Sequence, residues 1–233
     1  MELYQVAVIT HIGAGSVALL TFWAAAWLKK GSPLHRRFGQ IYLLAMLTVI
    51  LSGVPLVLVL QERGHPVTAL FLGYLLVLVS NSCLTAFRAI RLKQQPARYF
   101  SALFWIVHGL TATSGLAVMA VGWSTGATLL MVFGSIGLFG LWGGIRAWRR
   151  APTHANWWLR EHYGAMIGNG VATHIAFFGI GLRSLLPGID PGLLTTFAWF
   201  GPLAAALLAG VWLDRTYGRR SAARPVRTTA SRA

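Results

Sequence analysis

Seven long apolar runs, separated by short segments that carry most of the charge, dominate this sequence. A membrane-spanning helix needs about 20 apolar residues at a rise of about 1.5 Å per residue. Each run meets that length, so the sequence predicts an all-α fold, a transmembrane bundle of seven helices. The expected spans are Leu3–Leu28, Gln40–Leu60, Val67–Phe87, Tyr99–Trp123, Ala127–Trp148, Tyr163–Leu186 and Leu193–Leu213.

The composition excludes the other broad classes. Hydrophobic residues make up 56% of the chain and charged residues only 11%, whereas a soluble domain carries roughly 25% charged residues. A disordered chain lacks this apolar content. The net charge of +15 would suggest nucleic acid in a soluble protein. Because the charges lie between apolar runs, we expect the lipid bilayer as the partner and no nucleic acid.

The basic residues predict the orientation. All Lys and Arg residues except Arg63 and Arg183 fall on one side of the expected spans, and the positive-inside rule makes that side cytoplasmic. We therefore expect the N-terminus outside and the C-terminus inside a bacterial cytoplasmic (inner) membrane. Residues 1–213 form the expected membrane domain. Residues 214–233 form a basic tail, which we expect to be disordered and to lie against anionic lipids.

The span interiors contain no Asp or Glu, because all five acids fall at span ends or in loops. Many ion-coupled transporters and proton pumps need such a group, so this absence disfavours a pump. No span interior offers a Lys for a retinal Schiff base. The Gly-x-Ser-x-Gly and His-Glu-x-x-His signatures of hydrolases and zinc proteases are also missing, and the sequence assigns no enzyme class.

Histidines are the distinctive polar residues of the spans. His11, His108 and His174 lie within expected spans, whereas His35 and His162 lie at the cytoplasmic boundary. Counting about 1.5 Å per residue from the inner edge, His108 and His174 could meet near the midplane. We expect one layer of histidines in the middle and outer membrane and another at the inner face.

This layering predicts binding of haem b, in which two imidazoles ligate one iron from opposite faces. Two among His11, His108 and His174 would be the ligands, and His35 and His162 would serve an inner haem or its propionates. Arg36 would pair with a propionate. The alternatives are copper or another metal at the same imidazoles, or histidines that only donate hydrogen bonds between helices.

Two asparagines also lie within expected spans. Asn81 lies in the third span and Asn169 in the sixth, and each needs a hydrogen-bonding partner in hydrocarbon. One interpretation is a hydrogen bond between helices. The other is a polar patch that binds a substrate or a quinone headgroup, with a redox protein as a further partner.

Two segments carry a resemblance. The first joins His11-Ile-Gly-Ala-Gly to Ser32-Pro-Leu-His35-Arg36-Arg-Phe-Gly39, and the second reads His162-Tyr-Gly-Ala-Met166-Ile-Gly168. Together they resemble a family of predicted bacterial multi-pass membrane proteins catalogued as a domain of unknown function. The resemblance implies that His11, His35, Arg36, His162 and Met166 are family features. It favours a site at His11 or in the His35/His162 layer.

A weaker, architectural likeness links the histidine layers to the two-haem b-type membrane cytochromes. The chain departs from that pattern, because His162 and His174 lie twelve residues apart, which turns them about 120° around a helix. Such residues would need a kink to face one axis.

Three functional hypotheses follow. The leading one is a haem b protein for electron transfer or redox sensing. The second is cofactor-free binding or transport of a small hydrophobic or anionic molecule, with Asn81, Asn169 and the histidines around a cavity. The third is an accessory membrane subunit whose lipid-facing surface binds a partner.

Overall fold

The computed structural model describes residues 2–151, 154 and 156–218, with the side chains of all but residues 180–185 and 218. Most of these residues are helical, and none lies in a strand. The elements are α1 (Glu2–Trp27), α2 (Pro33–Glu62), α3 (Pro66–Arg91), α4 (Pro96–Tyr99), α5 (Ala102–Thr125), α6 (Thr128–Arg150), α7 (Trp157–Leu185), α8 (Pro191–Leu213) and the π-helical turn η1 (Asp214–Gly218).

Six of these helices, α1, α2, α3, α5, α6 and α8, are long and apolar enough to cross a membrane, judged within the described residues. Each coincides with an expected span within a few residues, except that α2 begins seven residues before its expected start, at Pro33. The long helix α7 covers the remaining expected span. The basic tail begins differently from the prediction, because η1 continues α8 through the first five tail residues. Residues 219–233 lie outside the described part of the chain.

Local signals in the sequence explain where several helices begin and end. The Ser32 side chain accepts a hydrogen bond from the His35 backbone N–H, and Pro33 occupies the first turn of α2. Asp190 caps α8 in the same way, through the Leu193 N–H at 2.8 Å. Both are favourable N-caps, because they satisfy a backbone donor that the helix cannot. Gly126 ends α5 with φ of 70°, a left-handed conformation that favours glycine.

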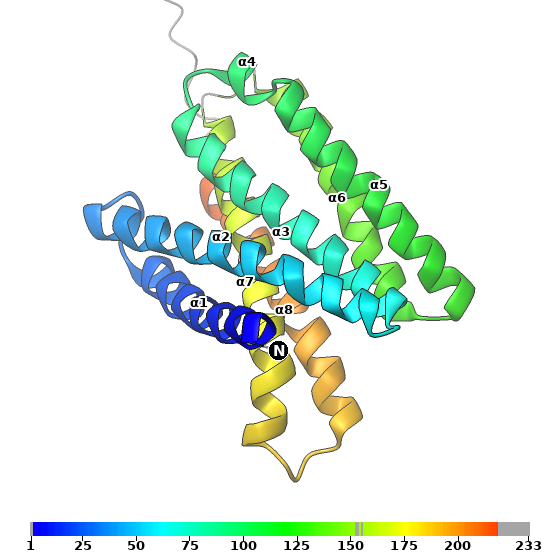
Figure 1. Cartoon of the computed structure of the whole chain (residues 1–233). Helices are drawn as coiled ribbons and strands as arrows, with labels where there is room; N and C mark the ends of the chain where they lie inside the picture. The colour runs from blue at the N-terminus through cyan, green and yellow to red at the C-terminus, as the bar shows by residue number, and fades with distance from the viewer. Residues whose placement is uncertain (1, 152–153, 155, 219–233) are drawn as a thin grey trace, which may run out of the picture.

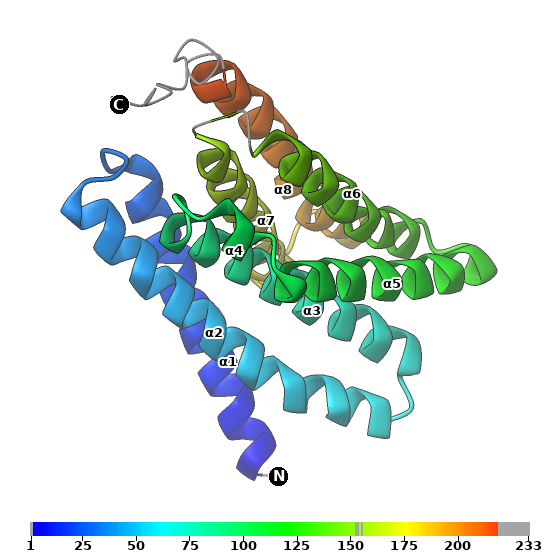
Figure 2. The ribbon, with the colours of Figure 1, turned by 90° about the horizontal axis from the view of Figure 1, so that it is seen from above.

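Three antiparallel hairpins surround α3 (Figures 1 and 2). They are α1–α2, α5–α6 and α7–α8, and α3 packs against α2, α5 and α7. The main apolar core includes Phe71 and Tyr74 of α3, Val118 of α5 and Phe133 of α6. Many apolar side chains remain on the outside of the bundle, as expected for helices that face lipid.

Small residues allow a close contact between α5 and α6. A Cβ added to Gly137 would lie 2.5 Å from the Thr111 backbone oxygen, and one added to Gly134 would lie 2.6 Å from the Gly115 oxygen. Tyr74 of α3 adds a polar bond here. Its hydroxyl donates to the Phe133 oxygen and accepts from the Gly137 N–H. Glycine therefore sets the distance between these helices, as in other membrane bundles.

Candidate functional site

The three histidines within the spans contact different helices. His11 of α1 donates from Nδ1 to the Ser52 hydroxyl of α2 at 3.1 Å, because that hydroxyl donates its own hydrogen to the Thr48 oxygen. His108 of α5 donates to the Phe104 oxygen, stacks on the Phe104 ring and approaches α6 at Gly144. The expected haem ligands thus lie in separate interfaces.

His174 of α7 uses both ring nitrogens. Its Nδ1 donates to the Gly170 oxygen at 2.7 Å, so its Nε2 accepts from Trp23 Nε1 of α1 at 2.9 Å. The structure does not bring His174 to His108, whose ring faces α6. His11 and Trp23 are twelve residues apart on α1, which separates them by about 18 Å along its axis.

A bis-histidine haem needs two free imidazole nitrogens facing each other across one slot. His11, His108 and His174 do not supply that arrangement. Among the described residues, no group of three or more His, Cys, Asp or Glu side chains could hold a metal ion. These three histidines therefore do not form the expected haem site, and haem binding stays a prediction.

The absorption spectrum tests this point directly. We expect the protein, purified with haem supplied during expression, to show no Soret band that depends on His11, His108 or His174. A Soret band that His108→Ala or His174→Ala abolishes, with His65→Ala as the control outside the spans, would contradict this expectation and restore the haem prediction.

The two boundary histidines do lie near each other. His35 donates from Nδ1 to the Ala25 oxygen at 3.0 Å, and His162 donates to the Ala86 oxygen at 3.1 Å. Burial lowers the pKa of His162, and the nearby His35 and Lys30 lower it further. Lys30 also donates to the Ala25 oxygen. Lys30 and His35 thus satisfy carbonyls at the end of α1, which have no partner within that helix.

The remaining predicted residues make hydrogen bonds within the protein. Arg36 donates from Nε to the Gly31 oxygen. Asn81 donates to the Thr111 hydroxyl of α5 and accepts from Thr85, which agrees with the interpretation as a bond between helices. Asn169 accepts from the Cys83 thiol, while its buried amide nitrogen has no partner among the described residues. Neither asparagine lines the cavity described below.

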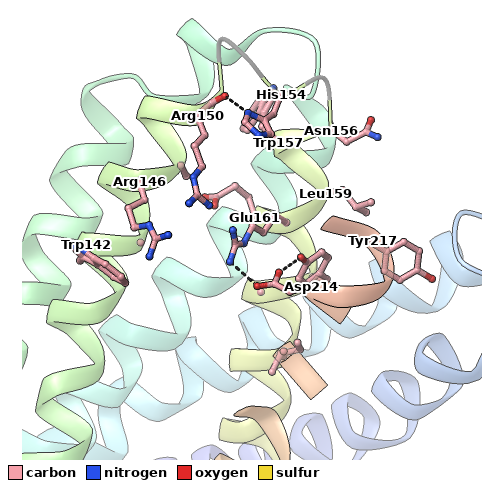
Figure 3. A pocket seen from close by; sticks show the side chains of 17 residues that line it. Trp142, Arg146, Arg150, His154, Asn156, Trp157, Leu159, Glu161, Asp214 and Tyr217 are labelled. Carbon is pink, nitrogen blue, oxygen red and sulfur yellow. Dashed lines mark hydrogen bonds and ion pairs between the residues drawn. The ribbon is translucent and has the colours of Figure 1, made fainter. Parts of the chain in front are cut away.

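That cavity, which we call the arginine cavity, has a volume of about 870 Å³ and lies between α6, α7 and the end of α8 (Figure 3). It is comparable to a ligand pocket, which measures about 300–1,000 Å³. The lining residues are Trp142, Gly143, Arg146, Ala147, Arg150, His154, Asn156, Trp157, Leu159, Arg160, Glu161, Tyr163, Gly164, Ile167, Gly210, Asp214 and Tyr217.

The wall from α6 carries one aromatic and two cationic side chains. Trp142, Arg146 and Arg150 are spaced four residues apart, which places them on one face of the helix. The Arg146 guanidinium lies over the Trp142 ring, 4.4 Å from its centroid. No carboxylate of the described residues lies within ion-pair distance of Arg146. Its charge is therefore available to a ligand.

The opposite wall holds the acidic residues in internal contacts. Arg160 pairs with Asp214 at 2.6 Å, and the Tyr163 hydroxyl donates to the same carboxylate (Figure 3). The Tyr99 hydroxyl of α4 donates to Glu161 at 2.9 Å. Burial raises the pKa of Glu161 to about 7, although Tyr99 and Arg160 act in the opposite direction. Near neutral pH the Glu161 carboxyl is only partly ionised, so it cancels only part of the positive charge of the cavity.

The start of α7 adds to this field. Helix α7 begins at Trp157, which lines the cavity together with Leu159 and Glu161 of the first turns. The N-terminus of a helix carries about half a positive charge, which favours anions, although the Trp157 and Leu159 N–H groups already donate to the His154 and Asn156 oxygens. The cavity therefore favours an anion, because it combines arginines, aromatic rings and a helix N-terminus.

Comparisons with protein-family models, with curated proteins and with solved structures return no match for this chain. The resemblance to the family of unknown function therefore stays a prediction. The site is interpreted from its own chemistry.

Sequence reasoning missed this cavity. It counted Arg146 and Arg150 only as markers of orientation. The signal that could have found it is the four-residue spacing of Trp142, Arg146 and Arg150, which repeats on one helix face at a span end.

Proposed function

We propose that this chain is a cofactor-free membrane protein that binds an anionic molecule in the arginine cavity. One observation carries the proposal. The Arg146 guanidinium lines a ligand-sized cavity, stacks on Trp142 and has no carboxylate partner among the described residues. Guanidinium groups bind carboxylates and phosphates through paired hydrogen bonds. A guanidinium charge in a cavity costs free energy unless water or an anion solvates it.

The proposal includes a location. We place the chain in a bacterial cytoplasmic membrane with α7 as the seventh span and the N-terminus outside. The arginine cavity then faces the cytoplasm, because it lies where α6 ends and α7 begins. The excess of Lys and Arg on that side supports this orientation.

Binding of inorganic phosphate to the purified protein tests the function. We expect isothermal titration to detect binding and Arg146→Gln to weaken it about tenfold, because a hydrogen bond to a charged group contributes about 1.5–3 kcal/mol. Arg91→Gln is the matched control, since Arg91 also lies over an aromatic ring, that of Phe87, but outside the cavity. Equal loss in both variants, or no binding by the parent protein, would refute the proposal.

A further inference from the structure

The arginine cavity changes character along its length. Arg150, His154 and Asn156 line its outer end, which is the end farther from the membrane midplane, where α6 stops and α7 has not yet begun. Trp142, Ile167 and the surrounding glycines line its inner end. Eight residues separate Arg150 from Trp142, which corresponds to about 12 Å along α6. A ligand that fills the cavity must therefore be charged at one end and apolar at the other.

The inner end lies at a seam between helix pairs. Helix α6 packs mainly against α5 and hardly meets α7, whereas α7 and α8 pack closely together. Gly143 of α6, Gly164 of α7 and Gly210 of α8 line this seam, and a Cβ added to any of them would meet no atom within 4 Å. The Trp142 side chain beside them is 57% exposed on the outside of the bundle. The seam thus offers an apolar exit toward lipid.

The volume also distinguishes between ligands. About 870 Å³ is far more than one phosphate needs, since a water molecule takes only about 30 Å³. The glycines leave the inner end wide enough for hydrocarbon, whose burial is favourable for each methylene. The charged groups alone would suit a free anion, but such a ligand would leave the apolar inner end of the cavity unfilled.

We propose that the arginine cavity binds the phosphate headgroup of an anionic phospholipid, whose acyl chains leave through the glycine-lined seam between α6 and the α7–α8 pair. This inference rests on the proposed function and narrows its ligand class. Arg146 would contact the phosphate, and Trp142 would pack along the first methylenes. The shared chemistry is a phosphate, which a lipid headgroup or free phosphate could supply.

The experiment compares these two sources on the full chain. The protein is reconstituted into phosphatidylcholine nanodiscs with or without phosphatidylglycerol, and retained lipid is measured by native mass spectrometry. Inorganic phosphate binding is measured in parallel by titration. Gly143→Leu fills the seam and leaves the arginines in place. Gly140→Leu is the matched control, because Gly140 lies on the same helix, outside the cavity, with open space beside it.

We expect retention of phosphatidylglycerol over phosphatidylcholine, a loss of about tenfold in Gly143→Leu, and no change in Gly140→Leu. Phosphate binding should survive Gly143→Leu, which also shows that this variant is folded. Arg146→Gln should weaken both ligands. Phosphate binding without phosphatidylglycerol selectivity, or equal effects of Gly143→Leu on both ligands, would overturn the lipid assignment and leave the anion site standing. Absence of phosphate binding by the parent protein would overturn the proposed function as well.

Discussion

Alanine at both Gly134 and Gly137 is expected to destabilise the bundle by about 3 kcal/mol or more. The added methyl groups would lie 2.5–2.6 Å from backbone oxygens of α5, and overpacking of a filled interior costs about 1–3 kcal/mol per site. A backbone oxygen cannot rotate away as a flexible side chain can. The α5–α6 pair would have to separate, and Tyr74 would lose its bonds to Phe133 and Gly137.

The midpoint of thermal unfolding in mild detergent, followed by circular dichroism, measures this loss. Gly140→Ala is the control on the same helix, because a Cβ there meets nothing within 4 Å. Alanine is intrinsically better in a helix than glycine by up to about 1 kcal/mol, so the control should be unchanged or slightly stabilised. A double variant as stable as Gly140→Ala would show that these glycines do not set the distance between α5 and α6.

The helices could be predicted from the sequence because their cause is local. A run of about 20 apolar residues must satisfy its backbone hydrogen bonds internally in lipid, and an α-helix does so. Ser32-Pro33 and Asp190-Pro191 mark helix starts with side chains that cap the first turn, although the expected second span, which begins at Gln40, does not use the first of these signals. These signals depend on neighbours in the chain, so no knowledge of the packing is needed to use them.

The site could not be predicted in the same way because its cause is tertiary. Depth along a span suggested that His108 and His174 could meet, but depth does not tell which way a ring points around its helix. In the structure one ring faces α6 and the other bonds Trp23 of α1. The arginine cavity exists because α6 packs against α5 and leaves a space beside α7. No residue count along one helix contains that information.

A fall in stability as pH rises from about 4.5 to about 7 is the second large effect expected, and Glu161 is its cause. Burial in the folded protein raises the pKa of Glu161 from its ordinary value of 4.5 to about 7. Between these values the folded state binds more protons than the unfolded state, so stability falls as pH rises. The contribution is fully present below about pH 4.5 and is lost above about pH 7. The shift corresponds to about 3 kcal/mol.

Unfolding midpoints between about pH 5 and pH 8 measure this dependence. Glu161→Gln should flatten the profile, because the amide stays neutral and can still accept from Tyr99. Glu62→Gln is the control, since Glu62 is an exposed residue at the end of α2. Tyr99→Phe supplies the second variant. The Tyr99 hydroxyl lowers the pKa of Glu161, so its removal should move the fall in stability to higher pH. A parent profile that Glu161→Gln leaves unchanged would assign the pH dependence to another group.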